Sequence, residues 1–380
     1  MTARSDVFVV AISQGPTPYY TPILNALSER VRLHVLYMRR GSRPGSAAAG
    51  WADFNDLWGE PPRFEHSFYR SLAIRMGRVD FHARVSVGIF RELRRLNPDV
   101  VLVHSWGPLM IEPLLWARLT RRHSVMWTES SARTGLFRDP VSMFIRRRLV
   151  ALADTFVATG RLATQFIIDL GADPGRVVRS CLPSALAETI AASQPTSRRS
   201  AVGSGTRFLF IGRLVELKRP IQLAQAFIRA LPSLDGATLT FVGEGPLRDR
   251  LAEIAAAESN IRLLERAEGE SLAARYMEAD VLVIPSEREV WGLVVNEALA
   301  AGLYVVATNQ VASAVELLDQ HSGLIVAQDD ADALVDALQV ADNAGRSEAD
   351  RLTRIARVRD CTSRSFAADL LRAVDLALSA

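Results

Sequence analysis

Residues 207–245, RFLFIGRLVELKRPIQLAQAFIRALPSLDGATLTFVGEG, decide the fold class of this 380-residue chain. The run Arg207–Ile211 is short and apolar, Pro220–Ala230 repeats apolar residues at helical spacing, and Thr238–Val242 is a second short apolar run. A strand, a helix and a strand in this order predict a βαβ unit whose two strands lie parallel in one sheet.

The same alternation continues through both halves of the chain and predicts an α/β fold with mostly parallel sheets. In the second half, further strands are expected at Ile261–Leu264, Val281–Ile284 and Tyr304–Thr308, and further helices at Pro246–Ala257, Ser271–Glu278, Leu293–Ala300, Ala333–Leu338 and Ser363–Ala380. In the first half, strands are expected at Val7–Ile12, Arg32–Tyr37, Val100–Val103, Ser124–Trp127 and Thr155–Ala158, and amphipathic helical stretches at Tyr20–Arg30, Val85–Leu96 and Leu149–Ala153.

The length of the chain indicates two domains, because domains average about 150 residues. The segment Ala192–Thr206, ASQPTSRRSAVGSGT, is polar and lacks apolar periodicity, so we expect an interdomain linker at 192–206. This divides the chain into an N-terminal Rossmann-like domain at 1–191, a C-terminal one at 207–362 and a terminal helix at 363–380. Ligands of such sheets bind at the carboxyl ends of the strands, so a cleft between the two domains is the expected site.

Composition favours a folded protein without a membrane span. Hydrophobic residues make up 49% and charged residues 23% of the chain. Cys181 and Cys361 are the only cysteines, which excludes a disulfide scaffold and fits a reducing compartment. The sequence has no signal-peptide pattern and no run of about 18 apolar residues, so we expect a cytoplasmic protein.

Charge is unevenly distributed between the two halves. Residues 1–190 contain 25 Arg and 16 Asp plus Glu, a net of +9, which leaves −6 for the remainder of a chain whose total is +3. A basic half indicates an anionic partner, such as an anionic membrane surface or an anionic acceptor, although solvated arginines explain it equally well. No nucleic-acid-binding motif accompanies the charge. Ser67–Arg84 and Arg146–Arg148 are the stretches that could lie on lipid.

Lys218 is the only lysine in the chain, beside 44 arginines. It follows Gly212 and Arg213 at the end of the strand Arg207–Ile211. Lysine provides a compact charge on a flexible stem and arginine a planar fork, so the two together could clamp a diphosphate. An exposed lysine without a function is the alternative.

Three further patterns lie at the expected strand ends. Gly243-Glu-Gly245 opens a helix, where glycines admit a close approach of the backbone and the helix N-terminus favours an anion, although a tight turn alone would also explain them. Glu289 and Glu297 bracket Gly292, which suits two sets of sugar hydroxyls with a phosphate between them, while two surface acids are the alternative. The acid cluster 329–332 imitates a metal site, but it precedes a helix and is better explained by N-capping.

The segments GRLVELKRP, FVGEGPLRDRL and SEREVWGLVVNEALAAGLYVVAT, in this order and spacing, resemble the donor-binding half of retaining glycosyltransferases of family 4. The resemblance covers roughly residues 208–338 and implies the GT-B fold, with two Rossmann-like domains facing across a cleft and a C-terminal helix that returns to the N-terminal domain. It implies that Arg213 and Lys218 bind the diphosphate of a nucleotide sugar, Glu297 the ribose and Glu289 the transferred sugar, with the nucleobase near Arg266. The other donor-binding residues that it implies are Gly15, Gly212, Gly243, Gly245, Gly292, Leu293 and Val294. Members of this family need neither a metal nor another cofactor.

The first half resembles bacterial polysaccharide and glycolipid glycosyltransferases more loosely, through GPTPYYTPILNALSERVRLHVLYM, PDVVLVHSWG and VMWTESS. Gly15-Pro16 stands where many members have paired glycines. The resemblance makes His104 and Glu129 acceptor-site candidates, and Trp51, in the long loop 41–66, could stack on a sugar. A hydrogen-bonded core histidine and a core tryptophan are the alternatives for His104 and Trp51.

The expected activity is transfer of a hexosyl group, with retained configuration, from a UDP- or GDP-sugar to a hydroxyl of a glycan, glycolipid or lipid-linked acceptor, as in polysaccharide biosynthesis. The catalytic candidates are Glu289, Arg213, Lys218 and His104. The alternatives are a glycosyltransferase for small natural products, a catalytically silent GT-B protein that binds a nucleotide sugar or glycan, and a peripheral membrane protein acting through its basic half.

Overall fold

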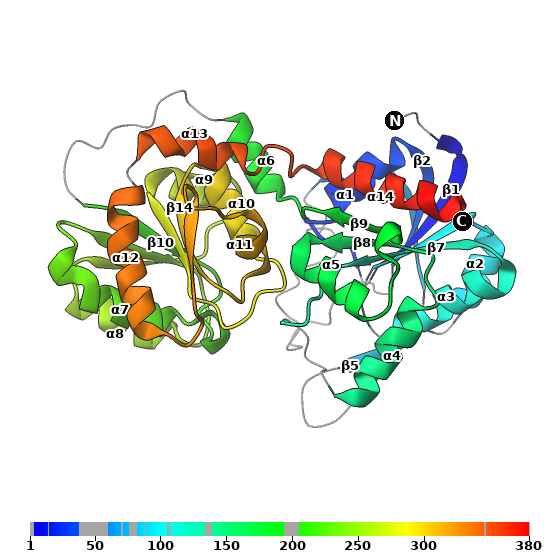
Figure 1. Ribbon diagram of the computed structural model, residues 1–380, viewed down its shortest axis with the longest axis horizontal. Helices are drawn as coiled ribbons and strands as arrows, with labels where there is room; N and C mark the ends of the chain where they lie inside the picture. The colour runs from blue at the N-terminus through cyan, green and yellow to red at the C-terminus, as the bar shows by residue number, and fades with distance from the viewer. Residues whose placement is uncertain are drawn as a thin grey trace. The chain divides into compact units, whose positions relative to one another are not determined.

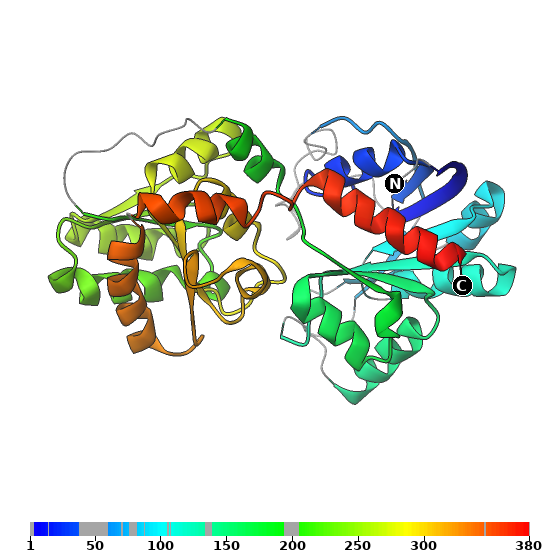
Figure 2. The ribbon, with the colours of Figure 1, turned by 45° about the horizontal axis from the view of Figure 1, so that its top comes forward.

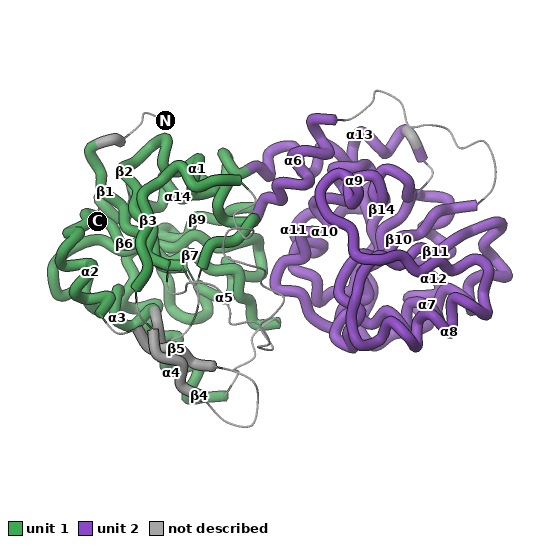
Figure 3. Tube along the Cα trace, turned by 180° about the vertical axis from the view of Figure 1, so that it is seen from behind, with its two compact units in different colours: residues 1–181, 363–380 green, residues 182–362 purple. Residues whose placement is uncertain are grey.

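The computed structural model describes residues 4–13, 15–37, 60–69, 71–75, 82–86, 88–104, 106, 108–133, 139–193, 205–345 and 347–379. The chain forms two compact units, drawn in different colours in Figure 3. The first unit combines residues 1–181 with residues 363–380, and the second comprises residues 182–362. Each unit is an α/β layer structure around its own sheet (Figure 1).

The sheet of the first unit has seven parallel strands in the order β3-β2-β1-β6-β7-β8-β9. The strands are β1 (Arg4–Ser13), β2 (Val31–Tyr37), β3 (Glu65–Phe68), β6 (Val100–His104), β7 (His123–Thr128), β8 (Thr155–Thr159) and β9 (Val177–Ser180). A separate antiparallel pair consists of β4 (Ser71–Arg75) and β5 (His82–Ser86). The central strands are apolar on both faces, as expected of a parallel sheet covered by helices on both sides.

Helices cover both faces of this sheet. They are α1 (Thr21–Ser28), α2 (Ile89–Leu96), α3 (Pro108–Thr120), α4 (Pro140–Val150), α5 (Gly160–Asp169) and α14 (Ser363–Leu378), with a 3₁₀ turn at Pro174–Arg176. One core joins α2, α3 and α5 to one face. The other face is covered by α1 and by α14, the red helix in Figure 2, whose Phe366 ring lies 4.8 Å from the ring of Trp127. The terminal helix therefore completes the first unit.

The sheet of the second unit has six parallel strands in the order β12-β11-β10-β13-β14-β15. The strands are β10 (Arg207–Ile211), β11 (Thr238–Val242), β12 (Ile261–Leu264), β13 (Val281–Ile284), β14 (Tyr304–Thr308) and β15 (Gly323–Val326). The helices are α6 (Ala185–Ala192), α7 (Pro220–Ala230), α8 (Arg248–Ala257), α9 (Gly269–Glu278), α10 (Leu293–Ala300), α11 (Ala312–Leu317), α12 (Ala331–Gly345) and α13 (Glu348–Ala356), with 3₁₀ turns at Glu216–Lys218 and Leu231–Ser233. A core of phenylalanine and aliphatic side chains joins α7, α8 and α12 to one face of the sheet.

The five strands expected between residues 207 and 308 have the predicted bounds, and so do α7 and α10. The first half needs corrections. The expected helical stretch Val85–Leu96 is strand β5 followed by α2, and the stretch Leu149–Ala153 is only the end of α4, which begins at Pro140. The edge strands β3, β9 and β15 were not foreseen, although β12 and β13, which are equally short, were.

The boundary between the units also differs from the expected linker. Residues 192–193 belong to the second unit, as does Thr206, whose buried hydroxyl donates to the carbonyl of Asp342. Most of the expected linker, 194–204, lies outside the described residues. The chain passes between units at 181/182 and at 362/363 instead, because α6 packs against α10 of the second unit.

The structure bears on two expectations that were drawn from composition, one about the cysteines and one about membrane-spanning helices. Cys181 and Cys361 are disulfide-bonded, whereas the sequence favoured reduced cysteines. None of the helices in the described part of the chain is long and apolar enough to cross a membrane.

The loops after β10 and β11 pack backbone against backbone, which explains the glycine at position 243. Gly243 has a φ of +154°, and a Cβ built there would lie 2.0 Å from the carbonyl oxygen of Gly212. From the sequence, the glycine at 243 was expected to let the backbone approach a ligand closely. In the structure, the backbone of the neighbouring loop makes this close approach.

Gly243→Ala is expected to lower the free energy of unfolding by roughly 1–3 kcal/mol, the usual range for overpacking. Urea unfolding of the variant measures this loss. Gly269→Ala is the matched control, because Gly269 also has positive φ, +54°, but no atom within 4 Å of the added Cβ. Equal losses in both variants would mean that backbone conformation, and not the contact with Gly212, is responsible.

Candidate functional site

The sheet of the second unit has a switch point beside β10, which pairs with β11 on one side and with β13 on the other. Connections that leave the two sides of a switch point diverge and open a crevice at the carboxyl ends of the strands. The loop after β10 carries Gly212, Arg213 and Lys218, and the loop after β13 carries Ser286 and Glu289. The two loops are joined where the Glu287 amide donates to the Leu217 carbonyl, at 2.9 Å.

Lys218 and Glu289 form an ion pair at this edge of the sheet. Their side chains are 17% and 15% exposed, so the pair is shielded from most of the solvent. The hydroxyl of Ser286 donates to Glu289 Oε1 at 3.3 Å, and the Glu289 amide donates to the carbonyl of Gln310 at 3.1 Å. The only lysine of the chain and the first glutamate of the sequence motif therefore belong to one cluster.

The other expected cations near this edge are more exposed. Arg213 is exposed, and no acidic side chain among the described residues lies within ion-pair distance of it. Arg266 is exposed as well and pairs with Glu268. Arg219, beside Lys218, is held away from the cluster by Asp329 and the carbonyl of Gln328.

The N-terminus of α10 also opens near the cluster. Gly292 precedes it with a φ of +95°, and no side chain caps the helix. The hydroxyl of Ser313 instead donates to the carbonyls of Trp291 and Gly292, at 2.7 and 2.9 Å, which fixes the turn. Leu293 and Val294, the first residues of the helix, are partly exposed. An uncapped helix N-terminus attracts anions through its free amides and its dipole.

Glu297 lies deeper than the sequence suggested. Its side chain is 7% exposed, and both carboxylate oxygens already accept hydrogen bonds, Oε1 from the Ser184 hydroxyl at 2.8 Å and Oε2 from the Tyr276 hydroxyl at 2.5 Å. Burial raises the pKa of Glu297, although these two hydrogen bonds favour the charged form. Burial and the adjacent carboxylate raise the pKa of Tyr276 as well.

Tyr276 and Ser184 were missed by sequence reasoning, because they lie on α9 and before α6, outside any motif. The ribose role of Glu297 stays a prediction. A carboxylate has about four acceptor positions, so the two internal bonds leave room for a ligand hydroxyl.

The acid cluster after β15 is engaged within the protein. Asp330 accepts a hydrogen bond from the Ala333 amide at 2.8 Å, as an N-cap does. Asp329 and Asp332 pair with Arg219 and Arg229. No three His, Cys, Asp or Glu side chains of the described residues are grouped so as to hold a metal ion.

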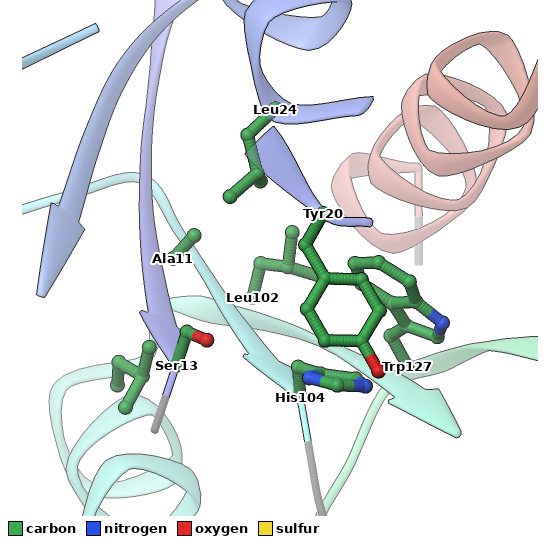
Figure 4. A pocket seen from close by; sticks show the side chains of 8 residues that line it. Ala11, Ser13, Tyr20, Leu24, Leu102, His104 and Trp127 are labelled. Carbon is green, nitrogen blue, oxygen red and sulfur yellow. The ribbon is translucent and has the colours of Figure 1, made fainter. Parts of the chain in front are cut away.

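The first unit has a small pocket at its own switch point, between the ends of β1 and β6 (Figure 4). It is lined by Ala11, Ile12, Ser13, Tyr20, Leu24, Leu102, His104 and Trp127. Figure 4 shows the rings of Tyr20, His104 and Trp127 grouped at one side, where the His104 ring lies 4.5 Å from that of Tyr20 and 4.3 Å from that of Trp127.

Glu129 adds a carboxylate to this aromatic group. Its Oε1 accepts a hydrogen bond from the Tyr20 hydroxyl at 2.8 Å and lies 3.5 Å from His104 Nε2. Burial and the nearby Glu129 raise the pKa of Tyr20 well above its usual value, so the phenol stays protonated and donates to the carboxylate. The structure thus brings the two expected acceptor-site residues together and adds Tyr20 and Trp127.

The structure gives no support to two expected site residues of the first unit, Gly15 and Trp51. Gly15 follows β1, and a Cβ built there would meet nothing within 4 Å, so packing does not demand glycine at this position. Trp51 lies outside the described residues.

Comparisons with known proteins find similarity to glycosyltransferases. Residues 205–341 match the family described as Glycosyl transferases group 1. A D-inositol 3-phosphate glycosyltransferase of Saccharomonospora viridis is 29% identical over 207 residues, which are 50% of this chain and 48% of that protein. The chain spans about half the length of the curated relatives that it matches.

Solved structures match over nearly the whole chain. The lipopolysaccharide outer core galactosyltransferase WaaB, in its apo form, has a TM-score of 0.71 at 11% identity and covers 97% of this chain and 99% of its own. Anabaena HepE in complex with UDP has a TM-score of 0.71 at 14% identity, with the same coverage. The two Rossmann-like units have the GT-B fold. Within it, the segment 205–341 matches the group 1 glycosyltransferases, and the chain is similar to glycosyltransferases in sequence.

Glu297→Gln is expected to become more stable than the wild type as the pH rises. Burial raises the pKa of Glu297 in the folded state, so its neutral form stabilises the fold, and this contribution is lost as the pH rises through the raised value. Near pH 4 both proteins carry a neutral side chain and should melt alike. Towards pH 8 the difference should reach about 1.4 kcal/mol for each unit by which the pKa is raised.

Thermal melting between these two pH values measures the effect. Glu253→Gln, at an exposed position of α8, is the control and should show no such trend. A Glu297→Gln variant that becomes less stable than the wild type at high pH would mean that the Tyr276 and Ser184 hydroxyls outweigh the cost of burying the charge.

Proposed function

We propose that this chain is a retaining hexosyltransferase that uses a nucleoside diphosphate sugar and a hydroxyl acceptor. The observation that carries the proposal is the cluster of Lys218, Ser286 and Glu289 at the switch point of the second sheet. A cation for a phosphate and a carboxylate for sugar hydroxyls lie side by side there, in a segment that matches the group 1 glycosyltransferases. HepE, which shares the fold, binds UDP, and this supports a nucleotide as the donor's carrier.

The donor would bind through its diphosphate. Lys218 and Arg213 supply two positive charges, and the uncapped N-terminus of α10 adds the amides of Leu293 and Val294. Charge develops on the β-phosphate as the nucleotide leaves, and fixed dipoles and cations in a site with little water stabilise that charge strongly. Binding the diphosphate draws Lys218 away from Glu289 and frees the carboxylate for the hydroxyls of the sugar. The ribose would then meet Glu297, and the base would lie near Arg266.

The reaction exchanges one bond at the anomeric carbon for another. The bond from this carbon to the phosphate oxygen breaks, and the bond to the acceptor oxygen forms on the same face. The proton of the acceptor hydroxyl passes to the departing phosphate oxygen, so no protein carboxylate has to form a covalent intermediate, in contrast to retaining glycosidases. Protein cations and helix amides carry the developing charge in this scheme, and we propose that no metal or other cofactor takes part.

The acceptor would be a glycan, a glycolipid or a lipid-linked sugar. His104, Glu129 and Tyr20 offer hydrogen-bonding groups beside the ring of Trp127, a combination that suits a sugar with one apolar face and several hydroxyls. By their names, the sequence relative acts on inositol 3-phosphate, and the structural neighbour WaaB acts on the outer core of lipopolysaccharide. Such acceptors fit a protein on the cytoplasmic side of the cell membrane, in polysaccharide or glycolipid synthesis.

A catalytically silent nucleotide-sugar-binding protein is the second candidate. It is favoured by the closed ion pair of Lys218 and Glu289, and by the internal hydrogen bonds on both oxygens of Glu297, because these groups satisfy one another without a ligand. The two candidates differ in turnover and not in donor binding.

A thermal-shift panel of UDP, GDP, ADP and TDP tests donor binding. One diphosphate is expected to raise the melting temperature of the wild type, by an amount equivalent to about 2.7 kcal/mol at a hundredfold excess over its Kd. Lys218→Ala should lose most of this shift, because it removes a phosphate contact. Arg229→Ala, which removes an exposed cation of the same unit, is the control and should keep it. No shift with any of the four nucleotides would overturn the donor proposal.

Turnover separates the enzyme from the silent binder. The nucleotide sugar selected by the panel should be hydrolysed slowly by the wild type, and Glu289→Gln should reduce this rate by about a hundredfold or more, as loss of one electrostatic contact to a transition state does. Glu216→Gln, an exposed carboxylate near Lys218, is the control and should hydrolyse like the wild type. Tight donor binding without hydrolysis or transfer would favour the silent binder.

A further inference from the structure

Large apolar side chains are unusually exposed on two neighbouring helices of the first unit, α3 and α4. Leu119 is 72% exposed, Val141 68% and Phe144 57%. The exposed apolar side chains of the two helices, together called the α3–α4 face, are Ile111, Leu115, Leu119, Val141, Phe144 and Ile145. They make up nearly half of the large apolar residues that are exposed anywhere in the described part of the chain.

On α4 these residues form a stripe. Val141, Phe144, Ile145 and Arg148 recur at the spacing of one helix face, while Leu149 and Val150, the buried residues of this helix, lie in its last turn. The earlier turns therefore add little to the core of the unit, and Figure 1 shows α4 as a long helix at the rim of this unit.

On α3 the same pattern appears. Ile111, Leu115 and Leu119 lie four residues apart along its exposed side, and Arg118 lies on the same side. The opposite side of α3 carries Leu114 and Trp116, which are buried in the core of the unit. Two helices in contact thus present apolar residues that folding does not use.

Positive charge accompanies the apolar stripe. Arg118, Arg121, Arg147 and Arg148 are exposed, and no acidic side chain that the structure describes lies within ion-pair distance of any of them. The guanidinium of Arg148 lies 4.9 Å from the ring centroid of Phe144, so charge and apolar surface are directly adjacent. The nearby acidic side chains accept hydrogen bonds from backbone amides. Asp139 accepts one from Ser142 and so caps α4, and Glu112 accepts one from Phe90.

Arg146 does not belong to this surface, although the sequence grouped it with its two neighbours. Its guanidinium lies over the rings of Trp106 and Phe166, at 5.3 and 5.6 Å, and burial lowers its pKa. The stretch Ser67–Arg84, the other segment that could lie on lipid, contains the end of β3, all of β4 and part of β5, together with residues that the structure does not describe. The structure does not describe the side chains of β4 and β5 either, so we draw no inference from this stretch.

We propose that the α3–α4 face binds an anionic lipid bilayer. Phe144 and Ile145 insert at the boundary between headgroups and acyl chains, and the arginines contact the headgroups. A helix that exposes bulky apolar residues with cations beside them is suited to this position. A second copy of the chain fits the face less well, because a twofold contact would place Arg147 and Arg148 near their own counterparts. An anionic bilayer complements both the charge and the apolar stripe.

Flotation of the full chain with vesicles tests the proposal. Binding is expected to vesicles of phosphatidylcholine mixed with phosphatidylglycerol, to be much weaker with phosphatidylcholine alone, and to fall as salt is added. Phe144→Ala/Ile145→Ala and Arg147→Gln/Arg148→Gln should each weaken binding by roughly tenfold, since each removes one part of the attraction. Val340→Ala/Leu352→Ala is the matched control, with two exposed apolar residues of the second unit, and should bind like the wild type.

Each variant changes exposed side chains only, and an unaltered melting temperature verifies its fold. The proposal is wrong if the wild type does not float, if it floats equally without phosphatidylglycerol, or if the α4 variants bind as tightly as the wild type. A dimer that depends on Phe144 and Ile145, without vesicle binding, would assign the face to a second copy and would also overturn it. The readout does not involve sugar transfer, so the proposal stands or falls separately from the proposed function.

Discussion

Parallel hydrogen bonding of β10 to strands on both of its sides is the constraint on which the second unit depends. β10 pairs with β11 through one edge and with β13 through the other, and the chain returns to β13 only after β12 has been added beyond β11. The loops after β10 and β13 therefore leave the same edge of the sheet next to each other. Lys218 and Glu289, 71 residues apart in the chain, meet for this reason. The first unit repeats the arrangement with β1 and β6, and there His104 and Tyr20 meet.

The two sites meet their electrostatic requirements in different ways. In the second unit a cation and a carboxylate neutralise each other in a setting that is mostly shielded from water, where a lone charge would be costly. In the first unit the carboxylate of Glu129 is held by a phenol whose own ionisation is suppressed by burial. A diphosphate can compete with a carboxylate for a lysine, whereas a neutral phenol stays in place when a neutral sugar enters. The pairing in each unit thus suits the charge of the ligand proposed for it.

Sequence reasoning recovered β10 to β14 well because these strands are bounded by glycine, proline or a clear helical repeat. Gly212, Gly243 and Pro220 mark element ends that the structure reproduces within two residues. It failed where a residue's role depends on contacts that are distant along the chain. The burial of Glu297 depends on Tyr276 and Ser184, and the inward turn of Arg146 depends on Trp106 and Phe166. Nothing local to Glu297 or Arg146 distinguishes them from exposed charges, so only the fold could reveal their surroundings.

The return of α14 to the first unit has a consequence for the order in which the protein forms during synthesis. Phe366, Leu370 and Val374 are buried in the first unit, and the hydroxyl of Thr155 donates to the carbonyl of Ala373. The ribosome makes these residues after the entire second unit, which is one continuous segment. The second unit can therefore fold while the first still exposes the apolar face of its sheet that α14 covers. Because domains generally fold as units as they emerge, the half that is made first becomes complete last.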